Sequence, residues 1–176
     1  MCKFKRVIIN RPCGVYCNLQ YIPFIESCFR KYFKFLVDDF SIDYVSDIYS
    51  LIESISPYLW VISDMNDRFM GFVFLDNFTG NRSFLYSAEL STCFDRRAWG
   101  SFTKFAAKIF LKKCFDELGL YKISARIYPD NFRIKNLLKT SGFDYEATLK
   151  NETLRFGKPQ DIEIYGLYRS YYYKLR

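Results

Sequence analysis

The stretch from Lys122 to Phe143 constrains the fold of this chain more than any other part. Its first half, Ile123 to Tyr128, alternates apolar with polar residues, which is typical of a half-buried strand. Pro129 cannot donate to a sheet and favours an extended residue before it, so the strand ends there. Asp130 or Asn131 can then cap a helix by accepting from its free backbone N–H groups.

The helix predicted in the second half of this stretch is short and amphipathic. Ile134, Leu137, Leu138 and Ser141 fall at helical spacing and give one buried face. Gly142 suits the left-handed position that closes a helix. The whole stretch therefore predicts a strand, a tight break and a capped helix.

The remaining segments predict further strands and helices. Strand patterns cover residues 5–10, 58–63, 69–75, 83–94, 145–150 and 161–168. Helical patterns cover residues 21–36, 42–55 with Ser41 as the cap, and 102–118. Turns at residues 64–68 and 77–81 make the strands between 58 and 94 consecutive and antiparallel, and the last two strands form a long hairpin. No linker or repeat interrupts the chain, so we expect a single domain over residues 1–176.

Composition excludes several classes of protein. Half of the 176 residues are hydrophobic, which is far from the signature of disorder. No apolar run reaches the length of a membrane span. The apolar run after the basic N-terminus, Val7 to Ile9, is too short for the core of a signal peptide. We therefore expect a soluble, cytoplasmic protein.

The chain has six cysteines and no histidine. Disulfides are not expected in the cytoplasm. Cys2, Cys13, Cys17 and Cys28 gather near the N-terminus, but their spacing matches no common zinc finger and no histidine can complete one. We expect free thiols and no metal. Since an imidazole base is also excluded, any proton transfer must use carboxylates, Tyr, Cys, Lys, water or the backbone.

The net charge is +7 and the pI is about 9.0. Such a charge serves solubility or attracts an anionic partner, for example a phosphate-bearing cofactor, an acidic protein or a nucleic acid. Lys104, Lys108 and Lys112 fall one turn apart on a predicted helix, as a solvated stripe or a nucleic-acid surface. Acidic residues near the first two helices form a solvated face or attract a cationic amine; they are Asp38, Asp39, Asp43, Asp47 and Glu53.

Asn131, Leu137, Leu138, Gly142 and Phe143 stand at the offsets of the pattern N-x-x-S-x-x-L-L-x-x-x-G-F. This series resembles a signature of the GNAT superfamily of acetyl-CoA-dependent N-acetyltransferases. Residues 143–150 and 157–167 are similar to segments of the branch that acetylates the N-termini of ribosomal proteins, and residues 68–73 look like the family's third strand. The resemblance covers roughly residues 58–172.

The resemblance implies an α/β (α+β) GNAT fold, with a mixed, mostly antiparallel sheet of about seven strands and helices on both faces. In this family two strands splay apart, here the strands at residues 83–94 and 123–128. The pantetheine arm of acetyl-CoA would lie in that gap and pair with the backbone near Thr92 and Phe94. Asn131 matches a family position that contacts coenzyme A.

GNAT enzymes bind the pyrophosphate of the cofactor with the backbone N–H groups of a loop and of the helix that follows. Residues 97–102 are the nearest match to their loop pattern, Q/R-x-x-G-x-G/A, although Phe102 stands where the family has a small residue. Without a cofactor, the same segment is an ordinary strand-to-helix turn. The residues that the resemblance assigns to this loop and its cations are Arg96, Arg97, Ala98, Trp99, Gly100, Ser101 and Phe102.

The reaction implied by the resemblance is direct attack of a neutral amine on the acetyl thioester. Glu89 is the candidate base, acting directly or through water; its alternative role is an outward-facing strand residue. Many GNAT enzymes carry a tyrosine acid seven residues after the asparagine, where this chain has Leu138. No acid carries over, and Tyr128 and Tyr165 are the candidates to replace it.

These patterns predict an enzyme that moves an acetyl group from acetyl-CoA to a primary amine, with a protein N-terminus or a lysine side chain as the expected acceptor. Polyamines and antibiotics stay open as acceptors. The alternative is a catalytically inactive GNAT-like module that binds nucleic acid or a partner protein. The tail Tyr171-Tyr172-Tyr173 is apolar enough to pack on the body or on a second subunit, so a homodimer also stays open.

Overall fold

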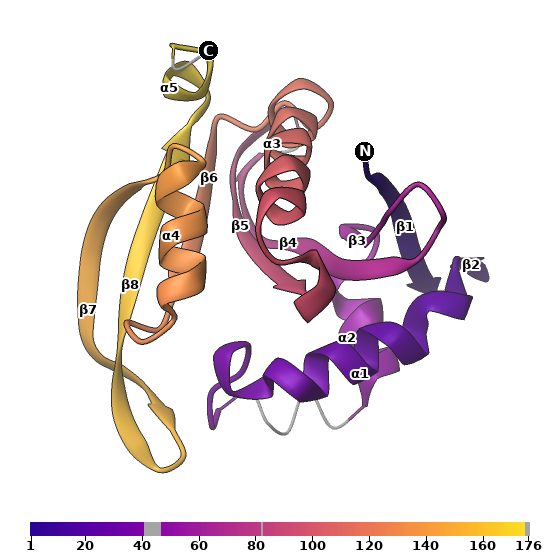
Figure 1. Ribbon diagram of the computed structural model, residues 1–176, viewed down its shortest axis with the longest axis horizontal. Helices are drawn as coiled ribbons and strands as arrows, with labels where there is room; N and C mark the ends of the chain where they lie inside the picture. Colours follow the sequence, from indigo (N-terminus) through magenta and orange to yellow (C-terminus); the bar gives the residue numbers. More distant parts are fainter. Residues whose placement is uncertain (41–46, 82, 175–176) are drawn as a thin grey trace.

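The computed structural model describes residues 1–40, 47–81 and 83–174 (Figure 1). Its centre is an eight-stranded sheet in the order β2-β1-β3-β4-β5-β6-β8-β7. Neighbouring strands are antiparallel except β5 and β6, which are parallel. The strands are β1 (Lys3–Asn10), β2 (Val15–Cys17), β3 (Leu59–Ser63), β4 (Phe69–Asn81), β5 (Phe84–Phe94), β6 (Lys122–Ile127), β7 (Asp144–Arg155) and β8 (Lys158–Tyr168).

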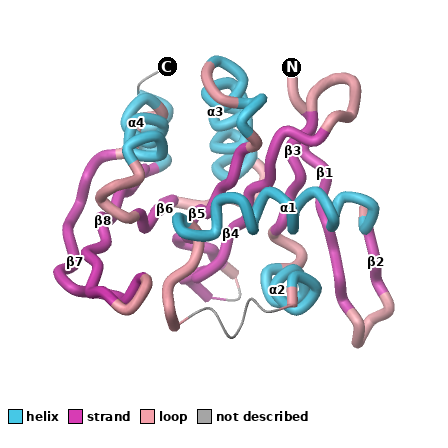
Figure 2. The backbone as a smooth tube through the Cα atoms, turned by 60° about the horizontal axis from the view of Figure 1, so that its bottom comes forward, coloured by secondary structure: helices cyan, strands magenta, loops and turns pink. Residues whose placement is uncertain are grey.

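Helices cover both faces of this sheet (Figure 2). One face packs under α3 and α4 around Trp60 and Phe115, and the other packs under α1 and α2 around Val7 and Phe72. This arrangement confirms the predicted fold class. The helices are α1 (Ile22–Tyr32), α2 (Ile48–Ile55), α3 (Ser101–Asp116), α4 (Phe132–Thr140) and α5 (Arg169–Lys174), with 3-10 turns η1 (Leu19–Tyr21), η2 (Phe33–Phe35) and η4 (Arg96–Ala98).

The sheet has one strand more than the seven predicted. The added strand, β2, pairs antiparallel with β1 at the edge of the sheet. All of its residues are exposed, so no alternation of apolar and polar residues marks it.

β4 and β7 exceed their predicted lengths more than any other strand in the described part of the chain. β4 runs through the turn expected at residues 77–81, because Asn77 (φ 46°) and Gly80 (φ 132°) are accommodated as irregularities in the pairing with β5. β7 continues to Arg155 past Asn151 (φ 51°), where the register with β8 shifts. Residues that favour turns, such as Asn77 and Asn151, thus lie at irregularities inside continuous strands.

The strand–break–helix unit from Lys122 to Phe143 forms as predicted. Asn131 caps α4, since its Oδ1 accepts from the backbone N–H of Ile134 at 3.4 Å. Asp130 is instead paired with Arg155, whose Nη2 lies 2.8 Å from Asp130 Oδ2. Gly142 follows the helix with a φ of 92°.

The predicted helix at residues 21–36 ends earlier than expected, because α1 stops at Tyr32 and passes into η2. The second helix begins at Ile48, with Asp47 accepting from the N–H groups of Tyr49 and Ser50. Ser41, the predicted cap, and Asp43 lie outside the described residues. No helix in the described part of the chain is both long and apolar enough to cross a membrane.

The structure also shows the state of the cysteines and the position of the C-terminal tail. All six cysteines are free, and the buried Cys28 and Cys93 lie with their sulfur atoms 3.4 Å apart. Tyr172 packs against Phe115 with ring centroids 5.0 Å apart, so the tail folds onto α3 of its own chain. The homodimer stays a prediction.

The parallel strands β5 and β6 separate after a short contact. They pair only where Ser87–Glu89 faces Lys122–Ser124. Beyond that point β5 stays paired with β4 as far as Phe94, and β6 stays paired with β8 as far as Ile127. Each strand is therefore held by its outer neighbour while a wedge opens between them, which is the splay that the family resemblance implied.

Candidate active site

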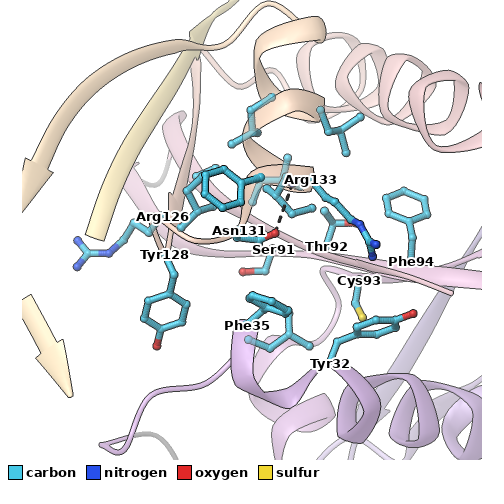
Figure 3. Close-up of a pocket in the computed structure, with 18 of the residues that line it drawn as sticks. Tyr32, Phe35, Ser91, Thr92, Cys93, Phe94, Arg126, Tyr128, Asn131 and Arg133 are labelled. Carbon is cyan, nitrogen blue, oxygen red and sulfur yellow. Dashed lines mark hydrogen bonds between the residues drawn. The ribbon is translucent and has the colours of Figure 1, made fainter. Parts of the chain in front are cut away.

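A cavity of about 1040 Å³ fills the wedge between β5 and β6 (Figure 3). Its walls come from the C-terminal halves of both strands, the first turns of α3 and α4, and the segment after α1. Ser91 and Cys93 point toward α1 in Figure 3, while Arg133 reaches in from α4. Beyond Glu89 no described strand pairs with β5 on the β6 side, so the backbone edge of residues 90–94 faces the cavity.

One end of the cavity is the start of α3. Gly100 precedes the helix with φ 104° and ψ −129°, a conformation that only glycine adopts readily, and a Cβ added there would meet no atom within 4 Å. No side chain caps the helix. The free N–H groups of its first turn and its positive dipole end are therefore available to an anion at this end of the cavity.

Two cations stand at the same end. Arg133 lies over the ring of Trp99, with its guanidinium carbon 3.7 Å from the ring centroid, and both residues line the cavity. Lys104, on the first turn of α3, lines it as well. The cavity thus offers positive charge beside free N–H donors, which suits the phosphates of coenzyme A.

Arg133 was missed by the sequence reasoning, and Lys104 was considered only as part of a lysine stripe. The sequence carries no local signal for Arg133, because its place at the cavity depends on its contact with Trp99 beside the start of α3. Lys112, from the same stripe, lies on the protein surface, where it forms an ion pair with Asp116 one turn along α3.

The residues predicted to bind the cofactor divide into two groups. Five line the cavity, namely Thr92, Phe94, Trp99, Gly100 and Asn131. Five do not, namely Arg96, Arg97, Ala98, Ser101 and Phe102.

The second group has other surroundings. Arg97 donates to Asp95 Oδ1 at 2.8 Å and to the carbonyl of Phe69 at 3.3 Å, which holds its guanidinium against the sheet. Ala98 is fully buried, and Phe102 packs against the core under α3. Arg133 and Lys104 thus stand at the cavity where Arg96 and Arg97 were expected.

The other end of the cavity, which we call the acidic end, carries four carboxylates among the described residues, although the cations Lys34 and Arg126 line the cavity as well. Glu89 lines it and accepts a hydrogen bond from Asn77 Nδ2 at 3.0 Å. Asp38, Asp130 and Glu152 line it too. Asp38 accepts from Thr153 at 2.6 Å, and the other two carboxylates are paired with arginines. A cationic amine would be attracted to this end.

Tyr128 is buried in the cavity wall, and its hydroxyl donates to the carbonyl of Val37 at 3.2 Å. Burial, and next the carboxylate of Asp38, raise the pKa of Tyr128 to about 12. The hydroxyl is therefore protonated at neutral pH but committed to the backbone. Tyr165, the other tyrosine considered as an acid, is buried and donates to Glu163 at 3.1 Å.

Residues 33–39, which we call the strap, tie the end of α1 to the β7–β8 hairpin. Asp39 is the centre of this contact: its carboxylate accepts from the N–H groups of Phe156 at 2.9 Å and Gly157 at 2.7 Å. Its own N–H donates to the carbonyl of Leu154 at 2.9 Å. Strap residues and the hairpin residues Thr153 and Ile162 also line the cavity, so the strap and the hairpin together form part of its wall.

We expect Arg133→Ala to weaken binding of acetyl-CoA about tenfold, since a charge-assisted hydrogen bond contributes about 1.5–3 kcal/mol. The loss should shrink as salt is added, because ions screen an exposed guanidinium. Isothermal titration measures both effects. Lys139→Ala removes a cation from the last turn of the same helix, outside the cavity lining, and should bind like the wild type. Equal losses of acetyl-CoA affinity in the two variants would contradict the assignment of Arg133 to the cofactor site.

Comparisons with known proteins identify a family and a shared fold. The family model described as an acetyltransferase (GNAT) domain matches residues 29–144. A solved structure of spermidine N-acetyltransferase from Vibrio cholerae, in complex with CoA and spermine, superposes with a TM-score of 0.73 at 17% identity, covering 98% of each chain. A chimera of that enzyme with another acetyltransferase gives a TM-score of 0.76 at 19% identity, again covering 98% of each chain. A search of curated protein sequences found no match.

Proposed function

The chain belongs to the family of GNAT acetyltransferase domains, and from that premise we propose that it transfers an acetyl group from acetyl-CoA to the primary amine of a protein, at an N-terminus or a lysine side chain. The observation that carries the proposal is the cavity in the wedge between β5 and β6. It has anion-binding groups at one end and carboxylates at the other.

The cofactor end fits coenzyme A. Arg133, Lys104 and the first turn of α3 would hold the phosphates. The open backbone edge of β5 near Thr92 and Phe94 offers hydrogen bonds to an extended pantetheine arm, and Asn131 stands beside it as the cap of α4. A thioester carbonyl directed along this edge would meet backbone N–H groups able to stabilise its oxygen.

The acidic end would prepare the acceptor. An amine arrives mostly as an ammonium ion at neutral pH, so a base must take one proton before the nitrogen attacks. Glu89 is placed for this role, because it lines the cavity and its Oε2 accepts from Asn77 while no described residue bonds its Oε1. When the C–N bond forms and the C–S bond breaks, the leaving thiolate takes a proton from water or from the attacking amine. Positioning of the two reactants supplies the rest of the rate.

The strap supports an acceptor that is a chain end or a single side chain. Because residues 33–39 are bound to the β7–β8 hairpin and line the cavity, they form part of the wall that an acceptor passes. An extended N-terminus or a lysine side chain is narrow enough to enter beside this wall. The similarity to the ribosomal-protein branch at residues 143–150 and 157–167 points to the same acceptors.

A polyamine is the second candidate. The carboxylates at the acidic end favour a polycation as well as a single amine, and the structural neighbours from Vibrio cholerae are spermidine N-acetyltransferases. Identity below 20% in both cases keeps this candidate behind the first.

The deciding experiment incubates the protein with acetyl-CoA and one of three acceptors: a lysine-free peptide with a free N-terminus, a blocked peptide with one lysine, or spermidine. Mass spectrometry reads the acetylated product. Acetylation of either peptide supports the first candidate, and acetylation of spermidine alone replaces it with the second. Binding of nucleic acid without any turnover or acetyl-CoA binding would favour an inactive module.

A further inference from the structure

Asp76 is a carboxylate that the proposed reaction has not yet used. It lies on β4 directly opposite Glu89 on β5, so the two side chains leave the same face of the sheet. That face is the one under α1 and α2, since the neighbouring Leu75 points into the core under α3. Directly opposed residues of an antiparallel pair hold their Cβ atoms about 5 Å apart, which brings the two carboxylates close together.

The surroundings of Asp76 leave its charge uncompensated. Its Oδ1 is buried and has no hydrogen-bond partner among the described residues. Nearby polar groups are bound to other residues. On β5, the hydroxyl of Ser87 shares a hydrogen bond with the hydroxyl of Thr79 at 2.7 Å. On α2, the carboxylate of Glu53 forms an ion pair with Arg11 at 3.3 Å. Next to β3, the ring of Tyr58 packs on Phe78. In the described structure, Glu89 is the one charged group that acts on Asp76.

The backbone beside Asp76 is irregular at this point. The pairing of β4 with β5 shifts register directly after Asp76, and Asn77 adopts a positive φ of 46°. The shift brings the amide of Asn77 onto Glu89 Oε2. Bulges next to active sites commonly re-aim a side chain in this way, and here the result fixes Glu89 beside Asp76.

Two carboxylates so placed do not ionise independently. Burial, and next the charge of Glu89, raise the pKa of Asp76 to about 6. Where two carboxylates interact by more than about one pKa unit, their protons leave in two steps that belong to the pair. A lone glutamate is a weak base toward an ammonium ion, and a second negative charge beside it makes it a stronger one.

We propose that Asp76 and Glu89 form a carboxylate dyad, in which Glu89 takes the proton from the acceptor amine and Asp76 acts through Glu89 to strengthen it as a base. Asp76 is thus a positioning residue that touches no substrate. This inference rests on the proposed function. One proton moves from the ammonium nitrogen to the dyad before attack and returns to solvent after product release.

The first test follows kcat/KM for acetyl transfer against pH. In the wild type the acid limb should lie near pH 6, where the second proton leaves the dyad. In Asp76→Asn the limb should move down by about one unit or more, because a negative charge beside the base is gone, and the plateau should fall about tenfold. Asp76→Glu, which keeps the charge, should restore much of the acid-limb position and of the plateau.

Asp161→Asn is the control. It removes a carboxylate that is paired with Lys150 outside the cavity lining, and it should change neither the acid limb nor the plateau.

A purely structural Asp76 would lower the rate without moving the limb, and that result would overturn the dyad. The second test needs no turnover. Carboxyl carbon-13 shifts follow the protonation of Asp76 in the wild type and in Glu89→Gln, and its midpoint should fall in the variant because a neighbouring negative charge is gone. An unchanged midpoint also overturns the dyad. If the protonation midpoint of Asp76 falls in Glu89→Gln but the protein acetylates no amine, the proposed function is wrong, while the coupling of the two carboxylates still holds.

Discussion

Gly100→Trp is expected to weaken binding of acetyl-CoA by about 30-fold, which corresponds to about 2 kcal/mol. Gly100 precedes α3 with a φ of 104°, so any L-residue there is strained by about 1–3 kcal/mol. A Cβ at this position would meet no protein atom within 4 Å, and the indole would therefore extend into the space in front of the first N–H groups of the helix. An anion at a helix N-terminus is stabilised by up to about 2 kcal/mol. The indole would occupy the place of that anion and remove this stabilisation.

Isothermal titration with acetyl-CoA measures the loss, and the affinity change converts at about 1.4 kcal/mol per factor of ten. Gly119→Trp is the matched control. Gly119 follows the other end of α3, also has a positive φ, at 70°, and also has no atom within 4 Å of an added Cβ. It should lose similar stability but bind acetyl-CoA normally. Wild-type affinity in a folded Gly100→Trp protein would remove the α3 N-terminus from the cofactor site.

Glu89→Gln is expected to lower kcat for acetyl transfer by about 100-fold to 1,000-fold, because a positioned general base contributes about that much. Glutamine can still accept from Asn77, so the shape of β5 is kept. Affinity for acetyl-CoA should change little, since Glu89 is not among the groups proposed to bind the phosphates, which are Arg133, Lys104 and the first turn of α3. Single-turnover kinetics at saturating acetyl-CoA separates the two effects.

Glu146→Gln is the comparison for this variant. Glu146 is also a strand glutamate with one partner, Lys122 at 2.7 Å, but it lies outside the cavity lining. Its kcat should match that of the wild type. If Glu89→Gln also kept the wild-type kcat, deprotonation would have to pass to water or another carboxylate, and Glu89 would be an outward-facing strand residue.

The local elements of this fold were readable in the sequence wherever one short segment decides its own conformation. Pro129, Asn131 and Gly142 act on their own backbone, so the end of β6, the cap of α4 and the close of α4 could be predicted from residue type. The same reasoning failed at Asn77 and Gly80, because these residues tolerate a bulge as well as a turn. The pairing with β5 decided between the two.

The sequence by itself determined the family, the order of most strands and helices, and the loop that ends at Gly100. Only the tertiary structure decided which charges meet at the site. Arg133 lies over Trp99, Asp39 binds the β7–β8 hairpin, and Asp76 stands opposite Glu89. The first two contacts join segments that are distant along the chain, and the third depends on the register between the consecutive strands β4 and β5. Residue type limits what a side chain can do, but the packing of the sheet determines which partner it finds.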